Sequence, residues 1–113
     1  MFFWRFQISK FIINGGQKLS GEIQCFGAKN AAMKMIAASI LIGDRVELEN
    51  VPDISDIQVL STILIKMGAQ IERDQHRLTL DTSQLKAIEP EASLVRSIRA
   101  SVVLIGPLLA RFG

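Results

Sequence analysis

The stretch that most constrains the fold runs from Gly27 to Gly43 and reads GAKNAAMKMIAASILIG. Its charged side chains are Lys29 and Lys34 alone, so it predicts a helix that is buried almost all round. Gly43 is placed to end this helix as a C-terminal cap. The rest of the chain must therefore supply the surfaces that cover the helix.

The chemistry of this helix is confined to its first turn. Free backbone N–H groups and the positive end of the helix dipole favour an anion there. Lys29 adds a full positive charge that the dipole disfavours unless a negative ligand is bound. We interpret Lys29 as a ligand group. The alternative is a structural lysine that extends from a core helix into solvent.

The segments before this helix alternate between apolar and polar residues, which is typical of strands. Short strands are predicted over 11–13 and 18–26, separated by the turn residues Asn14-Gly15-Gly16. Cys25 lies in the second of these strands, where we expect a small buried thiol. A single cysteine allows no internal disulfide and favours a reducing cytoplasm.

After the helix, period-two alternation predicts a strand over 45–51, which Pro52 ends. A capping box of Ser55 and Gln58 opens a second helix, which Gly68 closes. The later segments are predicted as a β-hairpin of 70–73 and 77–80, a polar linker over 81–90, and a helical pattern over 93–112 that Pro107 should kink or split.

This order of elements predicts an α/β unit with a mixed sheet. The segments Lys29–Gly43 and Arg99–Gly113 also resemble each other, since each begins with a cation and small residues and ends at a glycine with the same spacing. The second segment is thus either the start of a second copy of the unit or a chance match between two apolar helices.

Composition excludes several classes of protein. A chain of 113 residues suits one modest domain, and a net charge of +2 is too small to indicate a nucleic-acid or membrane partner. The longest uncharged runs fall short of the roughly 18 to 20 residues that span a bilayer. We predict no signal peptide, because Arg5 interrupts the apolar N-terminus.

Other candidate site residues are weaker. His76 lies in the predicted hairpin turn and is expected to be a solvated surface residue. No Cys, His or carboxylate cluster has metal-ligand spacing, so we predict no metal. Gly15-Gly16 lacks the further glycine of a nucleotide-binding loop. The arginines form no continuous basic run, and three of them are interpreted as solvated: Arg73, Arg77 and Arg96.

Several motifs in a fixed order resemble the UDP-N-acetylglucosamine 1-carboxyvinyltransferases, a branch of the enolpyruvyl transferase family. The resemblance covers about Lys10 to the end. The sister branch, which makes enolpyruvylshikimate phosphate, has a Ser-Lys-Ser type of sequence where this chain has Gly-Ala-Lys-Asn. The motifs are Gly27 to Ala32, Glu49 to Pro52 with Asp56, Met67 to Ala69, Ser97 to Ser101, and Gly106 to Gly113.

The resemblance implies a truncated fold of repeated βαβαββ units, an inside-out α/β barrel. It places 10–27 as strands of the second domain of that fold. Residues 28–113 would be the first repeat and the start of the second repeat of the first domain. Ligands would bind between the two domains, with the lysine turn near the hinge. Residues 1–9 have no counterpart and are expected to be an extension.

The resemblance also implies a reaction and its site. The enolpyruvyl group of phosphoenolpyruvate would pass to the 3′-hydroxyl of UDP-N-acetylglucosamine with release of phosphate, without a cofactor. This step belongs to cytoplasmic peptidoglycan synthesis, and so to cell wall biogenesis, cell shape and cell division. Lys29 and Asn30 would contact phosphoenolpyruvate, and Arg99 would lie at the nucleotide-sugar site. Asp56 is a possible further site residue.

The resemblance assigns proton donation to a cysteine on a loop beyond Gly113, and Cys25 is not at that position. We therefore expect this chain to be a fragment without catalytic activity. The alternative is a small α/β interaction module that has kept the repeat fold and lost the chemistry.

Overall fold

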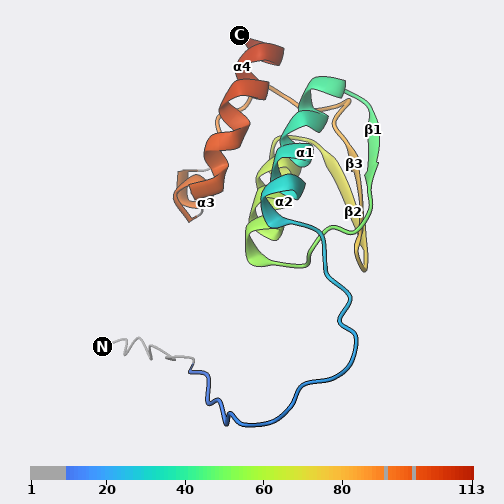
Figure 1. The fold of residues 1–113 in the computed structure, drawn as a ribbon. Coiled ribbons are helices and arrows are strands. Elements are labelled where there is room, and N and C mark those ends of the chain that lie inside the picture. The colour runs from blue at the N-terminus through green and yellow to red at the C-terminus, as the bar shows by residue number, and fades with distance from the viewer. Residues whose placement is uncertain (1–9, 91, 98) are drawn as a thin grey trace, which may run out of the picture.

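The computed structural model describes residues 10–90, 92–97 and 99–113. The predicted extension, 1–9, lies outside the described residues. Figure 1 shows the order of elements along the chain. They are α1 (Lys29–Ile42), β1 (Arg45–Leu48), α2 (Ser55–Lys66), β2 (Gln70–Asp74), β3 (Arg77–Asp81), α3 (Ala92–Ser97), the 3-10 helix η1 (Arg99–Leu104) and α4 (Ile105–Phe112).

The three strands form one sheet in the order β1-β3-β2, and both neighbouring pairs are antiparallel. The predicted hairpin is confirmed, with Gln70 opposite Asp81 and Asp74 opposite Arg77. The prediction of a mixed sheet is wrong for the described residues. The hairpin strand β3 lies between β1 and β2 and runs antiparallel to both, so no parallel pair forms. Apolar side chains of alternate positions, such as Leu78 and Leu80, are buried on one face of the sheet.

Helices α1 and α2 cover this apolar face, and the η1–α4 segment packs on the side of α1 away from the sheet (Figure 1). The fully buried side chains come mainly from α1, α2 and the inner face of the sheet, and they form one core. A hydrogen bond of 2.8 Å from the Thr82 hydroxyl to the Ser39 carbonyl joins the end of β3 to α1. Arg111 of α4 donates to the Ile40 carbonyl at 2.8 Å and so joins α4 to the carboxyl end of α1.

Helix α1 is buried along one stripe only, so the expectation of burial almost all round is wrong. Ile36 and Ile40 are fully buried, whereas Met35, Leu41 and Ile42 are 44 to 60% exposed. The predicted cap is confirmed. Gly43 has a φ of +67°, and its N–H donates to the Ser39 carbonyl at 3.3 Å.

Helix α2 has the predicted buried residues and the predicted end, but it begins in another way. Its apolar positions at helical spacing are all buried, and Gly68 follows its last turn with a φ of +103°. The prediction of a capping box is wrong, since Ile54 is the N-cap and no side chain caps the helix. Gln58 instead donates to the Asp53 carboxylate at 2.9 Å.

The C-terminal pattern is split, as predicted, but its breaks lie before Pro107. Pro107 is the third residue of α4, close to the start of a helix, where proline is tolerated. The sequence echo is therefore incomplete in three dimensions, because α1 is one continuous helix while the matching segment is η1 followed by α4. None of the described helices is long and apolar enough to cross a membrane.

The segment before α1 forms neither of the two predicted strands. Residues 10–27 lie extended alongside no other strand (Figure 1), and Phe11, Leu19 and Ile23 are more than 90% exposed. Cys25 is exposed, so the expectation of a buried thiol is wrong as well. The alternation is present in the sequence, but a strand requires a neighbour for its backbone N–H and C=O groups.

Candidate functional site

The candidate site lies where the amino ends of α1 and α2 meet. The two helices run in the same direction (Figure 1), which places Lys29 and Asp56 side by side in their first turns. The Lys29 ammonium lies 2.9 Å from the Asp56 carboxylate, and the two side chains are 46% and 24% exposed. Lys29 is therefore a partnered cation at the surface.

The amino end of α1 leaves its backbone donors available. Its N-cap, Ala28, offers no side-chain acceptor, and no acidic residue lies in the first turn. The first backbone hydrogen bond of the helix is donated by the Ala32 N–H to the Ala28 carbonyl at 3.0 Å. Asn30 is exposed beside these donors. An ammonium has three hydrogens, so the bond to Asp56 leaves donors on Lys29 for an anion.

Arg99, the third predicted site residue, is exposed at the start of η1. The η1–α4 segment runs in the same direction as α1 in Figure 1, so Arg99 and Lys29 belong to the same end of the structure. Among the described residues, however, no hydrogen bond or ion pair joins Arg99 to Lys29, Asn30 or Asp56. The structure brings Asp56 to Lys29 and leaves Arg99 separate.

The way in which the chain enters α1 is fixed by a close backbone contact. A Cβ atom at Gly27 would overlap the carbonyl oxygen of Asn50. Asn50 itself has a φ of +55°, in the left-handed region. At the preceding residue, the centroid of the Phe26 ring lies 4.8 Å from the centroid of the His76 ring. The β1–α2 loop and the hairpin turn thus hold the two residues that precede the lysine turn.

Gly27→Ala is expected to break this contact and to lower the free energy of unfolding by about 1 to 2 kcal/mol, because the methyl group requires a shift of backbone. Urea unfolding measures the loss, and the NMR signals of the His76 ring report whether Phe26 has moved. Gly15→Ala is the matched control, since nothing lies within 4 Å of a Cβ at Gly15. Equal free energies of unfolding for the two variants would contradict the close contact between Gly27 and the Asn50 carbonyl.

The hollows of the described structure lie elsewhere. An apolar one of about 410 Å³ lies between residues 87–90 and α4, and a polar one of about 290 Å³ is lined by the β1–α2 loop and the hairpin turn. Neither includes Lys29, Asn30 or Asp56. His76 lines the polar cavity and is exposed, as predicted for a surface turn residue. No metal-binding group of three or more His, Cys, Asp or Glu residues occurs in the described part of the chain.

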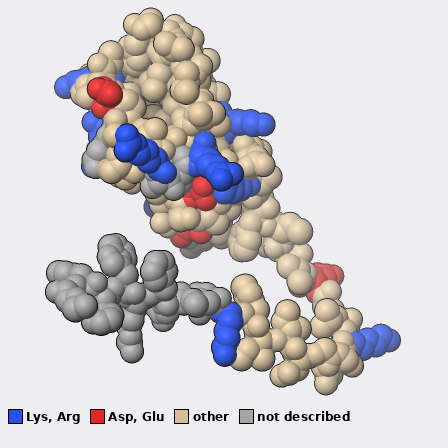
Figure 2. All heavy atoms as spheres, turned by 90° about the vertical axis from the view of Figure 1, so that its left-hand side faces the viewer, with Lys and Arg blue, Asp and Glu red and all other residues tan. Residues whose placement is uncertain are grey.

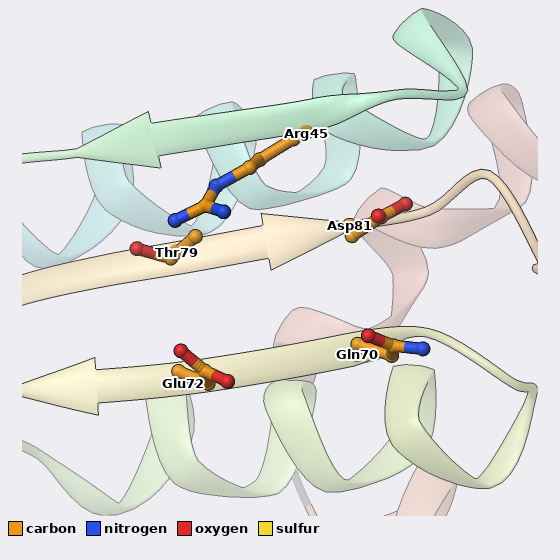
Figure 3. A pocket seen from close by; sticks show the side chains of 5 residues that line it. All are labelled: Arg45, Gln70, Glu72, Thr79 and Asp81. Atoms are coloured by element: carbon orange, nitrogen blue, oxygen red, sulfur yellow. The ribbon is translucent and has the colours of Figure 1, made fainter.

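The outer face of the sheet is polar and holds a shallow hollow of about 60 Å³. Figure 3 shows the Arg45 guanidinium extending toward Thr79 across this face. Hydrogen bonds from the side chain and the backbone of Ser83, followed by the charge of Arg45, lower the pKa of Asp81 below its ordinary value of 3.8. The hollow is lined by one cation, two carboxylates and two neutral polar side chains, namely Arg45, Glu72, Asp81, Gln70 and Thr79, which is typical of a solvated sheet face.

Comparison with known proteins places the chain among enolpyruvyl transferases. The family model of EPSP synthase (3-phosphoshikimate 1-carboxyvinyltransferase) matches residues 13–113. UDP-N-acetylglucosamine 1-carboxyvinyltransferase 1 of Clostridium acetobutylicum is 42% identical over 94% of this chain and 26% of its own length. The corresponding enzyme of Desulfatibacillum aliphaticivorans is 44% identical over 92% of this chain and 25% of its own.

A solved structure supports the same relationship. The enolpyruvyl transferase NikO from Streptomyces tendae matches with a TM-score of 0.79 and 34% identity, over 88% of this chain and 23% of that one. The chain thus spans about a quarter of the length of the relatives it matches. Its described part has the fold of the matching part of an enolpyruvyl transferase. The family resemblance is confirmed, and the chain belongs to the EPSP synthase family of enolpyruvyl transferases.

Proposed function

We propose that this chain forms part of a cytoplasmic UDP-N-acetylglucosamine 1-carboxyvinyltransferase. In this reaction the 3′-hydroxyl oxygen of the sugar would lose its proton and form a bond to C2 of phosphoenolpyruvate, while C3 takes up a proton. Loss of a proton from C3 would then restore the double bond as the bond between C2 and the phosphate oxygen breaks, and phosphate leaves. The identity to relatives of this name supports the proposal, as does the pairing of Lys29 with a carboxylate beside open helix donors.

The observation that carries the proposal is the position of Lys29 at the uncapped amino end of α1. Phosphoenolpyruvate bears a phosphate and a carboxylate, and both suit a cation beside backbone N–H donors. Lys29 would stabilise negative charge as it moves toward the leaving phosphate. Asn30 would donate or accept a hydrogen bond at the same ligand, and Asp56 would orient the ammonium.

Arg99 would bind the nucleotide sugar, for which its planar guanidinium suits a diphosphate. Residues 10–27 form no strand in this structure, and we propose that they pair as strands of the second domain in the whole enzyme, which is consistent with their exposed apolar side chains. The resemblance implies a cysteine as proton donor, and Cys25 is not at its position. We therefore expect this chain alone to bind phosphoenolpyruvate without turnover.

A second candidate is an interaction module without the chemistry. The tan area in the upper part of Figure 2, above several Lys and Arg side chains, favours it. Ile105 and Leu109, which are 55% and 60% exposed at the apolar cavity, favour it as well. Such a module would associate through this surface and would not respond to phosphoenolpyruvate.

The two candidates are distinguished by titration of the chain with phosphoenolpyruvate, followed by NMR. We expect shifts of the first-turn amides of α1, and Lys29→Ala should weaken binding about tenfold or more, because a hydrogen bond to a charged group is lost. Lys34→Ala is the matched control, since Lys34 is exposed on the same helix beyond the first turn. Shifts that are absent, or equal losses in both variants, would contradict the proposal.

A further inference from the structure

Arg73 occupies a position that the strand pattern assigns to the core. Along β2, Ile71 and Arg73 share the face that packs against the helices, and Arg73 is paired with the buried Leu78. Its side chain is only 23% exposed, so the prediction of a solvated arginine is wrong here. An arginine thus ends a row of side chains that otherwise consists of Leu48 and Leu78.

The guanidinium of Arg73 joins two separate segments. Its Nη1 atom donates to the carbonyl of Gln75 at 3.0 Å in the hairpin turn, and to the carbonyl of Val51 at 3.4 Å in the β1–α2 loop. Its Nε atom lies 4.0 Å from the Asp53 carboxylate. These contacts fix the loop that leads into α2.

Arg73 provides this link at a cost to stability. Its Nη2 atom is buried and has no hydrogen-bond partner among the described residues. A buried donor without an acceptor is unfavourable, and an aliphatic side chain at this position would avoid that penalty. The guanidinium is therefore better explained by the geometry it imposes on the loop than by a gain in stability.

The loop leads directly to the candidate site. The Asp53 carboxylate, which Arg73 approaches, also accepts a hydrogen bond of 2.9 Å from Gln58 in the first turn of α2. Asp56 lies in the same turn and holds the Lys29 ammonium. A continuous series of contacts therefore runs from β2 through the loop to the amino end of α1.

We propose that Arg73 is a positioning residue that orients Asp56, and through Asp56 the Lys29 ammonium. The value of this orientation for ligand binding rests on the proposed function, whereas the effect of Arg73 on the Lys29–Asp56 pair does not. Arg77 lies on the opposite face of the same hairpin, where it pairs with Glu47 and Glu49 at 3.3 Å. It offers a matched control for loss of a guanidinium.

The test compares Arg73→Met with Arg77→Met in the whole chain by NMR. The Lys29 ammonium signal, assigned by its loss in Lys29→Ala, reports the pair with Asp56. Hydrogen exchange of the Ile57 and Gln58 amides reports the first turn of α2, where both donate to the Ile54 carbonyl. In Arg73→Met we expect the ammonium signal to be lost and these amides to exchange about tenfold faster. Arg77→Met should change neither.

A conservative variant separates positioning from folding. Arg73→Lys keeps a cation in the core row but cannot bridge the two segments as a planar fork does, so it should restore the signal only in part. Asp53→Ala removes the Asp53 contacts with Arg73 and Gln58 at an exposed side chain and leaves the two carbonyl bonds of Arg73 in place. It should still disturb the ammonium signal, and it provides a test even if Arg73→Met does not fold. An unchanged ammonium signal in Arg73→Met or Asp53→Ala would overturn the proposal.

The proposed function can fail without this inference failing. A chain that does not bind phosphoenolpyruvate, but in which Asp53→Ala abolishes the ammonium signal, would retain the positioning role and lose the ligand. A chain that binds phosphoenolpyruvate, with an ammonium signal indifferent to Arg73 and Asp53, would retain the ligand and lose the positioning role.

Discussion

Gly68→Ala is expected to lower the free energy of unfolding by about 3 kcal/mol, because two penalties act at the same position. The φ of Gly68 is +103°, which a residue with a side chain rarely adopts. A Cβ atom there would also lie 2.8 Å from the carbonyl oxygen of Gln84. That backbone cannot easily retreat, since the Lys86 N–H donates to the Met67 carbonyl at 2.8 Å. Urea unfolding measures the change.

Gly106→Ala is the matched control. Gly106 lies in α4, and nothing lies within 4 Å of a Cβ atom there. Alanine forms helices better than glycine, so this variant should be as stable as the parent chain or more stable by up to about 1 kcal/mol. If Gly68→Ala were also neutral, the close approach of the linker to the end of α2 would be wrong.

The parts of the fold that could be predicted from the sequence are those that local signals determine. Helix α2 follows from apolar residues at helical spacing together with Gly68, and the hairpin follows from two alternating segments around a polar turn. The end of α1 follows from Gly43, because a left-handed cap favours glycine. Each of these signals lies within a few residues of the element that it specifies.

The two strands predicted before α1 do not form, because alternation is a property of one segment while strand pairing requires two. Residues 18–26 have a clear apolar parity, yet no strand of the described structure lies beside them. Cys25 is exposed for the same reason. The sheet order was equally inaccessible, since nothing local states that β3 lies between β1 and β2.

The candidate site was predicted in part. Lys29 stands out because a cation at the amino end of an uncharged helix opposes the dipole. Its pairing with Asp56 depends on the packing of α1 beside α2, which no local pattern describes. The sequence predicts a solvated Arg73, although this residue shares the parity of Ile71 along β2. That parity was the signal that could have placed it toward the core.

Ile36→Ala is expected to lower the free energy of unfolding by about 3 to 4 kcal/mol, because it removes a fully buried side chain at the centre of α1 and leaves a cavity. Helix α1 contacts α2, the sheet and the η1–α4 segment, so the surrounding groups cannot all move in to fill the space. Urea unfolding followed by circular dichroism measures the loss. The preceding residue, Met35, provides the comparison.

Met35→Ala removes a side chain that is 44% exposed and should cost less than about 1 kcal/mol, since less apolar surface returns to water and alanine favours the helix. Similar losses at positions 35 and 36 would mean that the outer face of α1 is also covered in solution. A midpoint of unfolding that rises with protein concentration would then identify a second copy of the chain as that cover. A large difference, with a midpoint independent of concentration, is the result that the one-sided burial of α1 requires.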